Sequence, residues 1–139
     1  MMEAAAVAAG DRLALVGVTV LTSHDAASYA RIVGRPVVDI DQEVQRRARE
    51  AVAAGLQGVV CSPREVGAVR RELGGEPFIV VPGIRRESDA RGDQARADTA
   101  RVAAAAGASH LVVGRPVLHA PDPAAALAEF MEEARCVPS

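Results

Sequence analysis

The chain has 139 residues, of which half are hydrophobic and only 2% aromatic, with a formal net charge of −2 at pH 7. That length predicts one domain over residues 1–139, with a core built from Ala, Val, Leu and Ile. The near-zero charge gives no general attraction to nucleic acid or membranes, and no run reaches the roughly 18 apolar residues of a membrane helix.

The composition also limits the cellular compartment that we expect and the kinds of catalysis that the chain can support. The first 12 residues lack a basic region ahead of an apolar one, so they do not indicate a secretion signal, and we expect a cytoplasmic location. Cys61 and Cys136 are too few and too far apart for a disulfide framework or a zinc site, and we expect neither a metal nor a cofactor. All 16 basic residues are arginine, which excludes Schiff-base chemistry or a lysine general acid supplied by this chain.

In chain order, an amphipathic helix over residues 1–12 precedes four strand–helix units. The predicted strands are continuously apolar, as expected when both faces of a sheet are covered; they lie at 13–21, 58–62, 78–81 and 110–114. The segment 28–38 is part helix and part linker. Caps and Ala-rich patterns predict the helices after the strands at 39–55, 62–75, 98–107 and 122–135.

One helix start carries an explicit signature. Ser62 is predicted as the N-cap, with Pro63 at the first helical position and Glu65 closing a capping box. Asp122 and Pro123 repeat the cap-then-proline arrangement at the last helix.

The order of these elements predicts an α/β fold. Strands separated by helices pair in parallel through right-handed crossovers. Four such units make either a small open sheet or one half of an eight-stranded barrel, and periodicity does not decide between them. In both cases ligands bind at the loops that follow the strands, which here are 22–27, 62–65, 82–94 and 115–122.

Two of these loops carry groups that suit a phosphate. In "LVVGRP" (111–116), Gly114 at a strand end lets a ligand approach the backbone, and Arg115 can hold a phosphate with two hydrogen bonds. In the long loop 82–94, Pro82 and Gly83 shape a turn, and Gln94 can donate and accept at once. The alternatives are that Gly114 only makes the turn, that Arg115 is a surface charge, and that the long loop is merely solvated.

The loop after the first strand offers weaker candidates. Thr22 and Ser23 can hydrogen-bond a heterocycle or cap the next helix, and capping is the commoner use. His24 lies next to Asp25, but adjacent residues rarely orient each other as a catalytic pair. His119 lies in a ligand-side loop without an obvious partner.

Two further groups have structural explanations. The carboxylates of Asp39, Asp41 and Glu43 are oxygen ligands that a metal would use, but helix capping by Asp39 or Asp41 explains most of the pattern. Cys61 lies in a predicted buried strand, which favours packing over a nucleophilic role.

Together, five stretches in this order resemble the carboxyl-terminal half of orotidine 5'-phosphate decarboxylase of the bacterial type. They are "VTVLTS" (18–23), "GLQGVVCSPREV" (55–66), "VPGIR" (81–85), "GDQAR" (92–96) and "GASHLVVGRPVLHAPDP" (107–123). The resemblance covers essentially the whole chain. It implies a parallel (βα)4 half of a TIM-type (β/α)8 barrel preceded by one helix, and a carboxy-lyase that converts OMP to UMP and CO2 in pyrimidine biosynthesis.

The resemblance also implies roles for single residues. In the family, the serine of the "LTS" block contacts the pyrimidine, the glutamine of "GDQ" bridges base and phosphate, and the arginine of "VGRP" holds the 5'-phosphate. The proline and glycine of "VPGIR" match the turn that lines the base. Carried over by position, the implied substrate-binding residues are Thr22, Ser23, Pro82, Gly83, Gln94, Gly114 and Arg115.

The main departure from the family is that the catalytic block of the family is absent from this sequence. The family's Asp-Lys-Asp catalytic array lies on the early strands, in a block that is absent here, and its lysine protonates the carbon that loses CO2. The resemblance therefore implies no catalytic residue in this chain, and no activity without a lysine-bearing amino-terminal half. Within the shared blocks, Arg85 matches the family, whereas Arg86 stands where a proline is usual.

A half-barrel has an energetic consequence. It leaves two strand edges unpaired and one apolar face uncovered. Each unburied Val or Leu forfeits roughly 1.5–3 kcal/mol, which a protein stable by about 5–15 kcal/mol cannot sustain over dozens of residues. We therefore expect this chain to pair with a copy of itself or with an amino-terminal half-barrel, and to bind OMP or UMP.

Three hypotheses remain open. The chain is the ligand-holding part of a decarboxylase, a non-catalytic module that binds a nucleotide phosphate, or a purely structural half-barrel that self-associates. A related sugar-phosphate barrel is the rival family, and the "LTS" and "GDQ" blocks argue against it.

Overall fold

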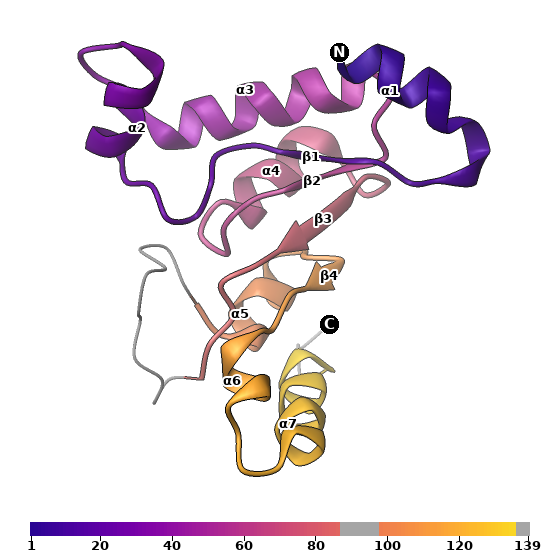
Figure 1. Ribbon diagram of the computed structural model, residues 1–139, viewed down its shortest axis with the longest axis vertical. Coiled ribbons are helices and arrows are strands. Elements are labelled where there is room, and N and C mark those ends of the chain that lie inside the picture. The colour runs from indigo at the N-terminus through magenta and orange to yellow at the C-terminus, as the bar shows by residue number, and fades with distance from the viewer. Residues whose placement is uncertain (87–97, 136–139) are drawn as a thin grey trace.

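Four short parallel strands form one sheet in chain order (Figure 1). The computed structural model describes residues 1–86 and 98–135. The strands are β1 (Val16–Val18), β2 (Gly58–Val60), β3 (Phe78–Val81) and β4 (His110–Leu111). Each pairs in parallel with the next, so the predicted α/β class is confirmed. Among the described residues β1 and β4 pair on one side only, and the sheet stays open at both edges.

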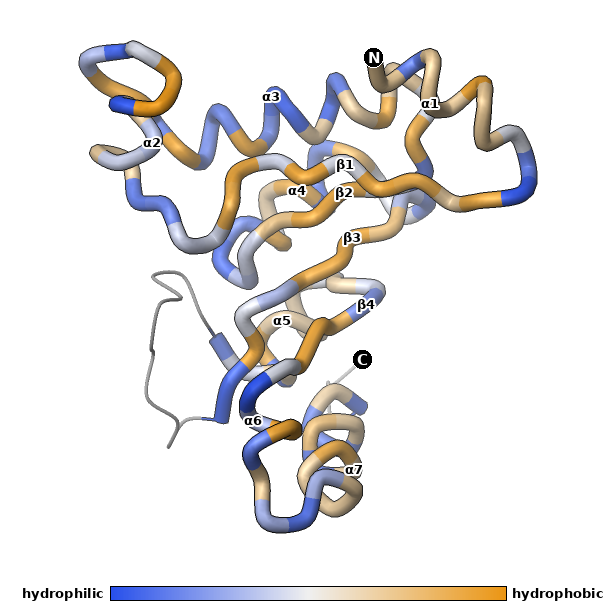
Figure 2. Tube along the Cα trace, viewed as in Figure 1, coloured by the Kyte–Doolittle hydropathy of each residue, from blue (hydrophilic) through white to orange (hydrophobic). Residues whose placement is uncertain are grey.

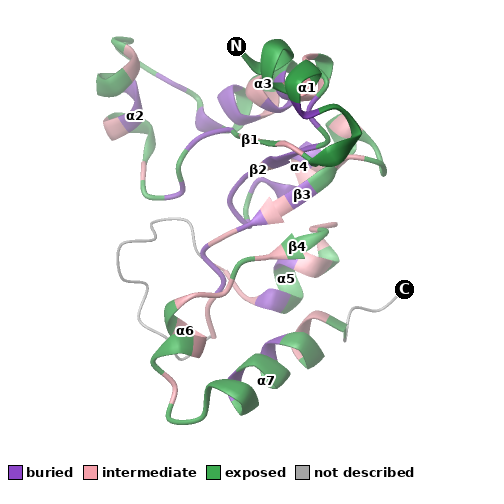
Figure 3. Cartoon of the chain, turned by 45° about the vertical axis from the view of Figure 1, so that its right-hand side comes forward, coloured by how far each residue is buried: buried purple, intermediate pink, exposed green. Residues whose placement is uncertain are grey.

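The helices connect these strands and cover one face of the sheet (Figures 1 and 3). Helix α3 leads from β1 to β2, α4 leads from β2 to β3, and α5 leads from β3 to β4, while α7 packs on α5 and α6. In the described part of the chain, no helix combines the length and apolarity needed to cross a bilayer. The bounds are α1 (Met2–Ala9), α2 (Ala26–Val33), α3 (Ile40–Ala53), α4 (Val66–Leu73), α5 (Ala100–Ala105), α6 (Arg115–Leu118) and α7 (Pro123–Arg135), with a 3₁₀ turn at Gly10–Arg12.

Several predicted helix ends are confirmed by cap hydrogen bonds. The Asp39 carboxylate accepts from the backbone N–H of Gln42 at the start of α3, and Asp122 accepts from Ala125 in α7. Gly55, just after α3, has a φ of 89°, a left-handed conformation that glycine adopts without a steric cost.

Some boundaries differ from the prediction: β1, β2 and β4 are shorter than the predicted strands, and α6 lies in the predicted loop 115–122. Helix α4 begins at Val66 rather than directly after Ser62, because residues 63–65 form a turn. Only half of the predicted capping box forms there: the Glu65 carboxylate accepts from the Ser62 backbone N–H at 2.7 Å, while the buried Ser62 hydroxyl has no hydrogen-bond partner in the described part of the chain.

The first third of the chain gives one confirmed prediction and one difference. The segment 28–38 is part helix and part linker as predicted, because it contains most of helix α2, which Asp25 caps through a box with Ser28. Helix α1 is not amphipathic in its packing, because only Ala9 is buried and Ala6 partly so, while Val7 is 84% exposed.

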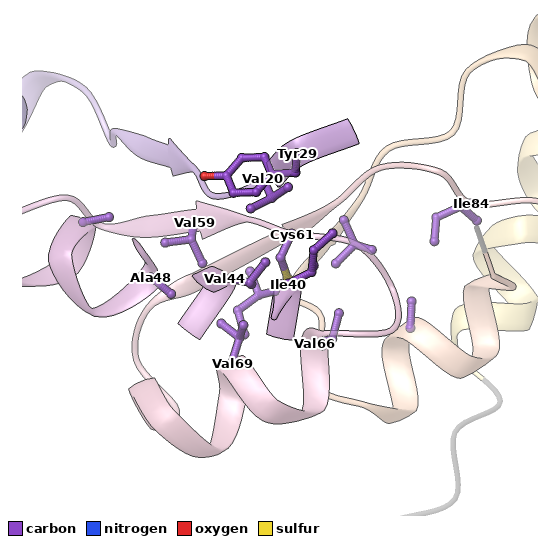
Figure 4. Close-up of a cluster of buried hydrophobic side chains, with 14 of the residues drawn as sticks. Val20, Tyr29, Ile40, Val44, Ala48, Val59, Cys61, Val66, Val69 and Ile84 are labelled. Atoms are coloured by element: carbon purple, nitrogen blue, oxygen red, sulfur yellow. The ribbon is translucent and has the colours of Figure 1, made fainter. Parts of the chain in front are cut away.

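The core lies between the sheet and its helices. Val59 and Ile79 are fully buried on the covered face of β2 and β3, and they pack in one cluster with Val44 of α3 and Val66 of α4 (Figure 4). The strands form the apolar centre of the molecule in Figure 2. Cys61 is buried in the same cluster, which confirms that it is a packing residue.

The opposite face of the sheet is apolar and largely uncovered. The pairing register places Val18, Val60 and Val80 in one row, so their side chains point to the same side. On this side Val18 is 56% exposed and Phe78 is 37% exposed, and Figure 3 shows β1 and β4 as largely exposed strands. We call this surface the open face.

A buried carboxylate joins α2 to α3. Glu43 is only 4% exposed, and its oxygens lie 2.9 Å from Arg35, 2.7 Å from Arg46 and 3.0 Å from Arg47. The Tyr29 hydroxyl of α2 donates to the same carboxylate at 3.2 Å. The hydrogen bonds from Arg46, followed by those from Arg35 and Arg47, hold the pKa of Glu43 far below its usual range despite burial. Glu43 is thus engaged with cations of its own chain.

This cluster predicts a pH-dependent stability. The folded state lowers the pKa of Glu43 below its ordinary value near 4.5, so the ionised carboxylate stabilises the fold above that pH, and the contribution is lost as the pH falls below it. Glu43→Gln should destabilise the protein at neutral pH and flatten the acid side of the stability profile. Urea denaturation at several pH values measures both effects.

Glu72→Gln is the matched control. Glu72 makes one ion pair at 3.0 Å, with the half-exposed Arg49. Such a surface pair contributes at most about 1 kcal/mol, so its loss should leave the acid slope unchanged. Equal acid slopes in wild type and Glu43→Gln would contradict the assignment.

Candidate functional site

The carboxyl ends of the strands lie at one edge of the sheet, toward the left of Figure 1. After β3 the chain turns at Pro82 and Gly83. Gly83 is buried and has a φ of 82°, and Ile84 is fully buried next to it. The turn is therefore fixed by packing and by a backbone conformation that favours glycine.

The long loop after β3 is closed at its base. Ile84 and Asp98 form a parallel bridge, and the Arg85 N–H donates to the Asp98 carbonyl at 3.0 Å. The Thr99 hydroxyl then caps α5 by accepting from the Val102 N–H. The predicted site residue Gln94 lies outside the described residues.

A hollow of about 610 Å³ opens between the base of this loop, α6 and the start of α7. Three arginines line it, each from or beside a strand end: Arg85 and Arg86 follow β3, and Arg115 follows β4. The other polar residues of its wall are His119, Asp122 and Glu129. Three guanidinium groups against two carboxylates favour an anionic ligand.

Arg115 sits where the backbone leaves space for such a ligand. It is the first residue of α6, directly after Gly114, whose carbonyl accepts from the N–H groups of Val117 and Leu118 at 3.0 Å. Within residues 1–86 and 98–135, a Cβ added to Gly114 would meet no atom within 4 Å, so this part of the chain leaves room for a ligand near the backbone. Arg115 itself is exposed and can offer a planar pair of donors to a phosphate.

The predicted residues after β1 lie apart from this hollow. Thr22 and Ser23 form a turn in which the His24 N–H donates to the Leu21 carbonyl at 3.0 Å. Thr22 is buried and Ser23 exposed, and neither lines the hollow. They do not cap α2 either, because Asp25 does.

The structure therefore brings together part of the predicted set. Arg115 lines the hollow, and Gly114 and the Pro82-Gly83 turn lie at the ends of neighbouring strands. Thr22 and Ser23 follow β1, separated from β3 by one intervening strand.

Sequence reasoning gave no site role to other residues of the wall. His119 follows Arg115 by four residues, one helical turn, and its N–H donates to the Arg115 carbonyl at 2.9 Å, so this spacing was a usable signal. Glu129 gave no local signal, because it reaches the hollow from α7 and meets Arg86 across 43 residues of sequence.

The Pro82-Gly83 turn can be tested by substitution. Gly83→Ala should destabilise the protein by about 1–2 kcal/mol, because an L-residue with a side chain is strained at positive φ. Gly67→Ala is the control, since Gly67 lies in α4 with only ordinary contacts around an added Cβ, and alanine is the better helix former. Chemical denaturation of both variants gives the comparison; a Gly83→Ala protein as stable as Gly67→Ala would contradict the strained turn.

Four parallel strands in chain order, helices on one face and an arginine-lined hollow at the carboxyl ends define half of a TIM-type (β/α)8 barrel. Residues 1–130 match the family described as "Orotidine 5'-phosphate decarboxylase / HUMPS family". The chain belongs to this family.

Its relatives are longer proteins. Orotidine 5'-phosphate decarboxylase of Anaeromyxobacter sp. (strain K) is 50% identical over 128 residues, which are 91% of this chain and 55% of the relative. The enzyme of Halorhodospira halophila is 48% identical over 138 residues, 96% of this chain and 57% of the relative. The chain thus spans about half the length of the curated relatives it matches.

Comparison with solved structures also shows that this chain covers about half the length of its relatives. The crystal structure of orotidine 5'-phosphate decarboxylase from Lactobacillus acidophilus matches with a TM-score of 0.73 and 31% identity, over 88% of this chain and 50% of that one. The enzyme from Pyrococcus horikoshii OT3 matches with a TM-score of 0.65 and 27% identity, over 94% and 56%. The sheet is therefore the half-barrel implied by the resemblance and not a small complete sheet.

Proposed function

We propose that this chain forms the phosphate- and base-binding half of an orotidine 5'-phosphate decarboxylase site, which converts OMP to UMP and CO2. The observation that carries the proposal is the hollow at the end of β4, which Arg115, Arg85 and Arg86 line in a member of this family. The 5'-phosphate binds to the Arg115 guanidinium and to the open backbone at Gly114.

The pyrimidine lies across the ends of the strands. Its edge contacts Ser23, supported by Thr22, while the Pro82-Gly83 turn lines its face and Gln94 bridges base and phosphate. This arrangement rests on the match to the family's blocks. It requires the β1 and β3 loops to face one ligand, which the common direction of the parallel strands supports.

The chemical step needs groups from outside this chain. Loss of CO2 from the substrate leaves an electron pair on the ring carbon, and a lysine ammonium donates the proton that replaces the carboxylate. Arginine cannot take this role, because its guanidinium does not give up a proton in proteins. The chain has no lysine, so we propose that a lysine-bearing amino-terminal half-barrel completes the active site.

The open face supports such a partner. Val18 and Phe78 on β1 and β3 expose apolar surface, and so does Val112 at the β4 edge. Beside that edge, an apolar groove of about 250 Å³ lies between the end of the sheet and α7. Its apolar lining is Leu111, Val113, Leu127, Phe130, Met131 and Ala134. A further strand–helix unit would bury this surface and pair the edge.

An alternative is a non-catalytic half-barrel that self-associates and binds a nucleotide phosphate, or binds nothing. The absence of lysine favours it as much as it favours a missing partner. In this case a second copy covers the open face, and no decarboxylation follows.

Ligand binding is the first test. In calorimetry, UMP should bind at least about tenfold tighter than uridine, because charge-assisted hydrogen bonds to the phosphate add to the affinity. Arg115→Ala should remove this difference, whereas Arg101→Ala, an exposed arginine of α5 outside the hollow, should keep it. Equal affinity for UMP and uridine in the wild type would refute the phosphate site.

Complementation tests the division of the active site. Mixing this chain with the lysine-bearing amino-terminal half of a relative should produce OMP decarboxylation, which is lost when that lysine is replaced. Sedimentation should show a one-to-one complex, with the chain alone self-associating or binding apolar dyes. An inactive mixture in which this chain remains a dimer of itself would favour the self-associating alternative.

A further inference from the structure

Arg86 connects three separate elements of the fold. It follows β3 at the base of the long loop, and it contacts both α6 and α7. Its Nη2 donates to Glu129 Oε2 at 2.8 Å, and its Nη1 donates to the Pro116 carbonyl at 3.4 Å. The guanidinium carbon lies 5.1 Å from the centroid of the Phe130 ring.

The ring side of this group of contacts is buried and the carboxylate side is not. Phe130 is only 3% exposed and the Arg86 side chain is 31% exposed, whereas the Glu129 side chain is 66% exposed. Water therefore screens the ion pair, and the buried ring and the α6 carbonyl contribute most to holding Arg86 in place. An arginine stacked on an aromatic ring and paired with a carboxylate uses the planar shape of its guanidinium, which lysine lacks.

Helix α6 depends on contacts of this kind. It has only four residues, and Pro116 at its second position has no N–H to offer. A helix so short is not stable by itself and is held by its surroundings. The Arg86 bond to the Pro116 carbonyl is one residue away from Arg115, the group that carries the proposed phosphate site.

We propose that Arg86 is a positioning residue, which fixes α6 against α7 and thereby holds Arg115 at the hollow. The inference rests on the proposed function for its effect on phosphate, while its effect on α6 does not. Arg86 is assigned to positioning rather than to the phosphate, because its two terminal nitrogens are directed at α6 and α7, where they donate to Pro116 and Glu129.

Hydrogen exchange tests the effect on α6. In Arg86→Ala and Arg86→Lys, the amides of Val117, Leu118 and His119, which donate within α6, should exchange at least roughly threefold faster, because local opening becomes easier. Amides of α3 should not change. Glu129→Gln should act in the same direction, and Glu133→Gln, one turn further along α7, is its control.

UMP and uridine affinities test the effect on the site. Arg86→Ala should weaken UMP binding by roughly tenfold and leave uridine binding unchanged, because only the phosphate-holding group is displaced. Arg86→Lys keeps the positive charge but not the planar fork, so a positioning role predicts a loss like that of alanine.

Each outcome decides a separate point. Unchanged hydrogen exchange in α6 in both Arg86 variants would overturn the proposal. An Arg86→Lys protein that binds UMP as tightly as the wild type would also overturn it, because this result would show that Arg86 acts by charge alone. If the wild type binds no UMP while α6 exchanges faster in the variants, the proposed function fails and the anchoring of α6 by Arg86 stands.

Discussion

The structure depends on one constraint: a parallel strand is stable when both of its faces are covered, and here helices cover only one. Val59 and Ile79 on the covered face are fully buried, while Val18 on the open face is more than half exposed. The strands are apolar on both sides because the fold requires cover on both. The burial that stabilises this sheet is thus one-sided, and in the proposed function a lysine-bearing half-barrel covers the open face.

The same constraint divides the candidate site into two parts. The proposed phosphate part is built from the end of β3, α6 and α7, which pack on one another through Arg86, Glu129 and Phe130. It therefore depends little on the open face. The base part needs the turn after β1 to lie opposite the turn after β3, and the curvature of the sheet between them is set by whatever closes the barrel. Phosphate binding should consequently be less sensitive to a partner than base binding.

Local chemistry made much of this fold predictable. Asp39 and Asp122 are typical N-cap residues, and they predict the starts of the helices that they cap. Gly55 and Gly83 occupy positions where the backbone has positive φ. The apolar runs predict four strands in the observed order. The start of α4 was misplaced because Pro63 and Glu65 fit both a helix and the turn that precedes it. Periodicity could not separate an open sheet from half a barrel, since both bury strands in the same way. The contact of Arg86 with Glu129 joins residues 43 apart, and no local pattern encodes it.

The composition agrees with the proposal that this chain binds the ligand and leaves the chemical step to other residues. A phosphate needs a fixed positive charge with directed donors, and arginine supplies both at any pH at which the protein folds. Protonating a carbon needs an acid that can release its proton and regain it, which lysine can do and arginine cannot. A chain with 16 arginines and no lysine therefore fits the proposed role of holding a substrate by its phosphate. Under the proposed function, the proton of the decarboxylation comes from a lysine outside residues 1–139, and the open face is the surface that a lysine-bearing half-barrel would cover.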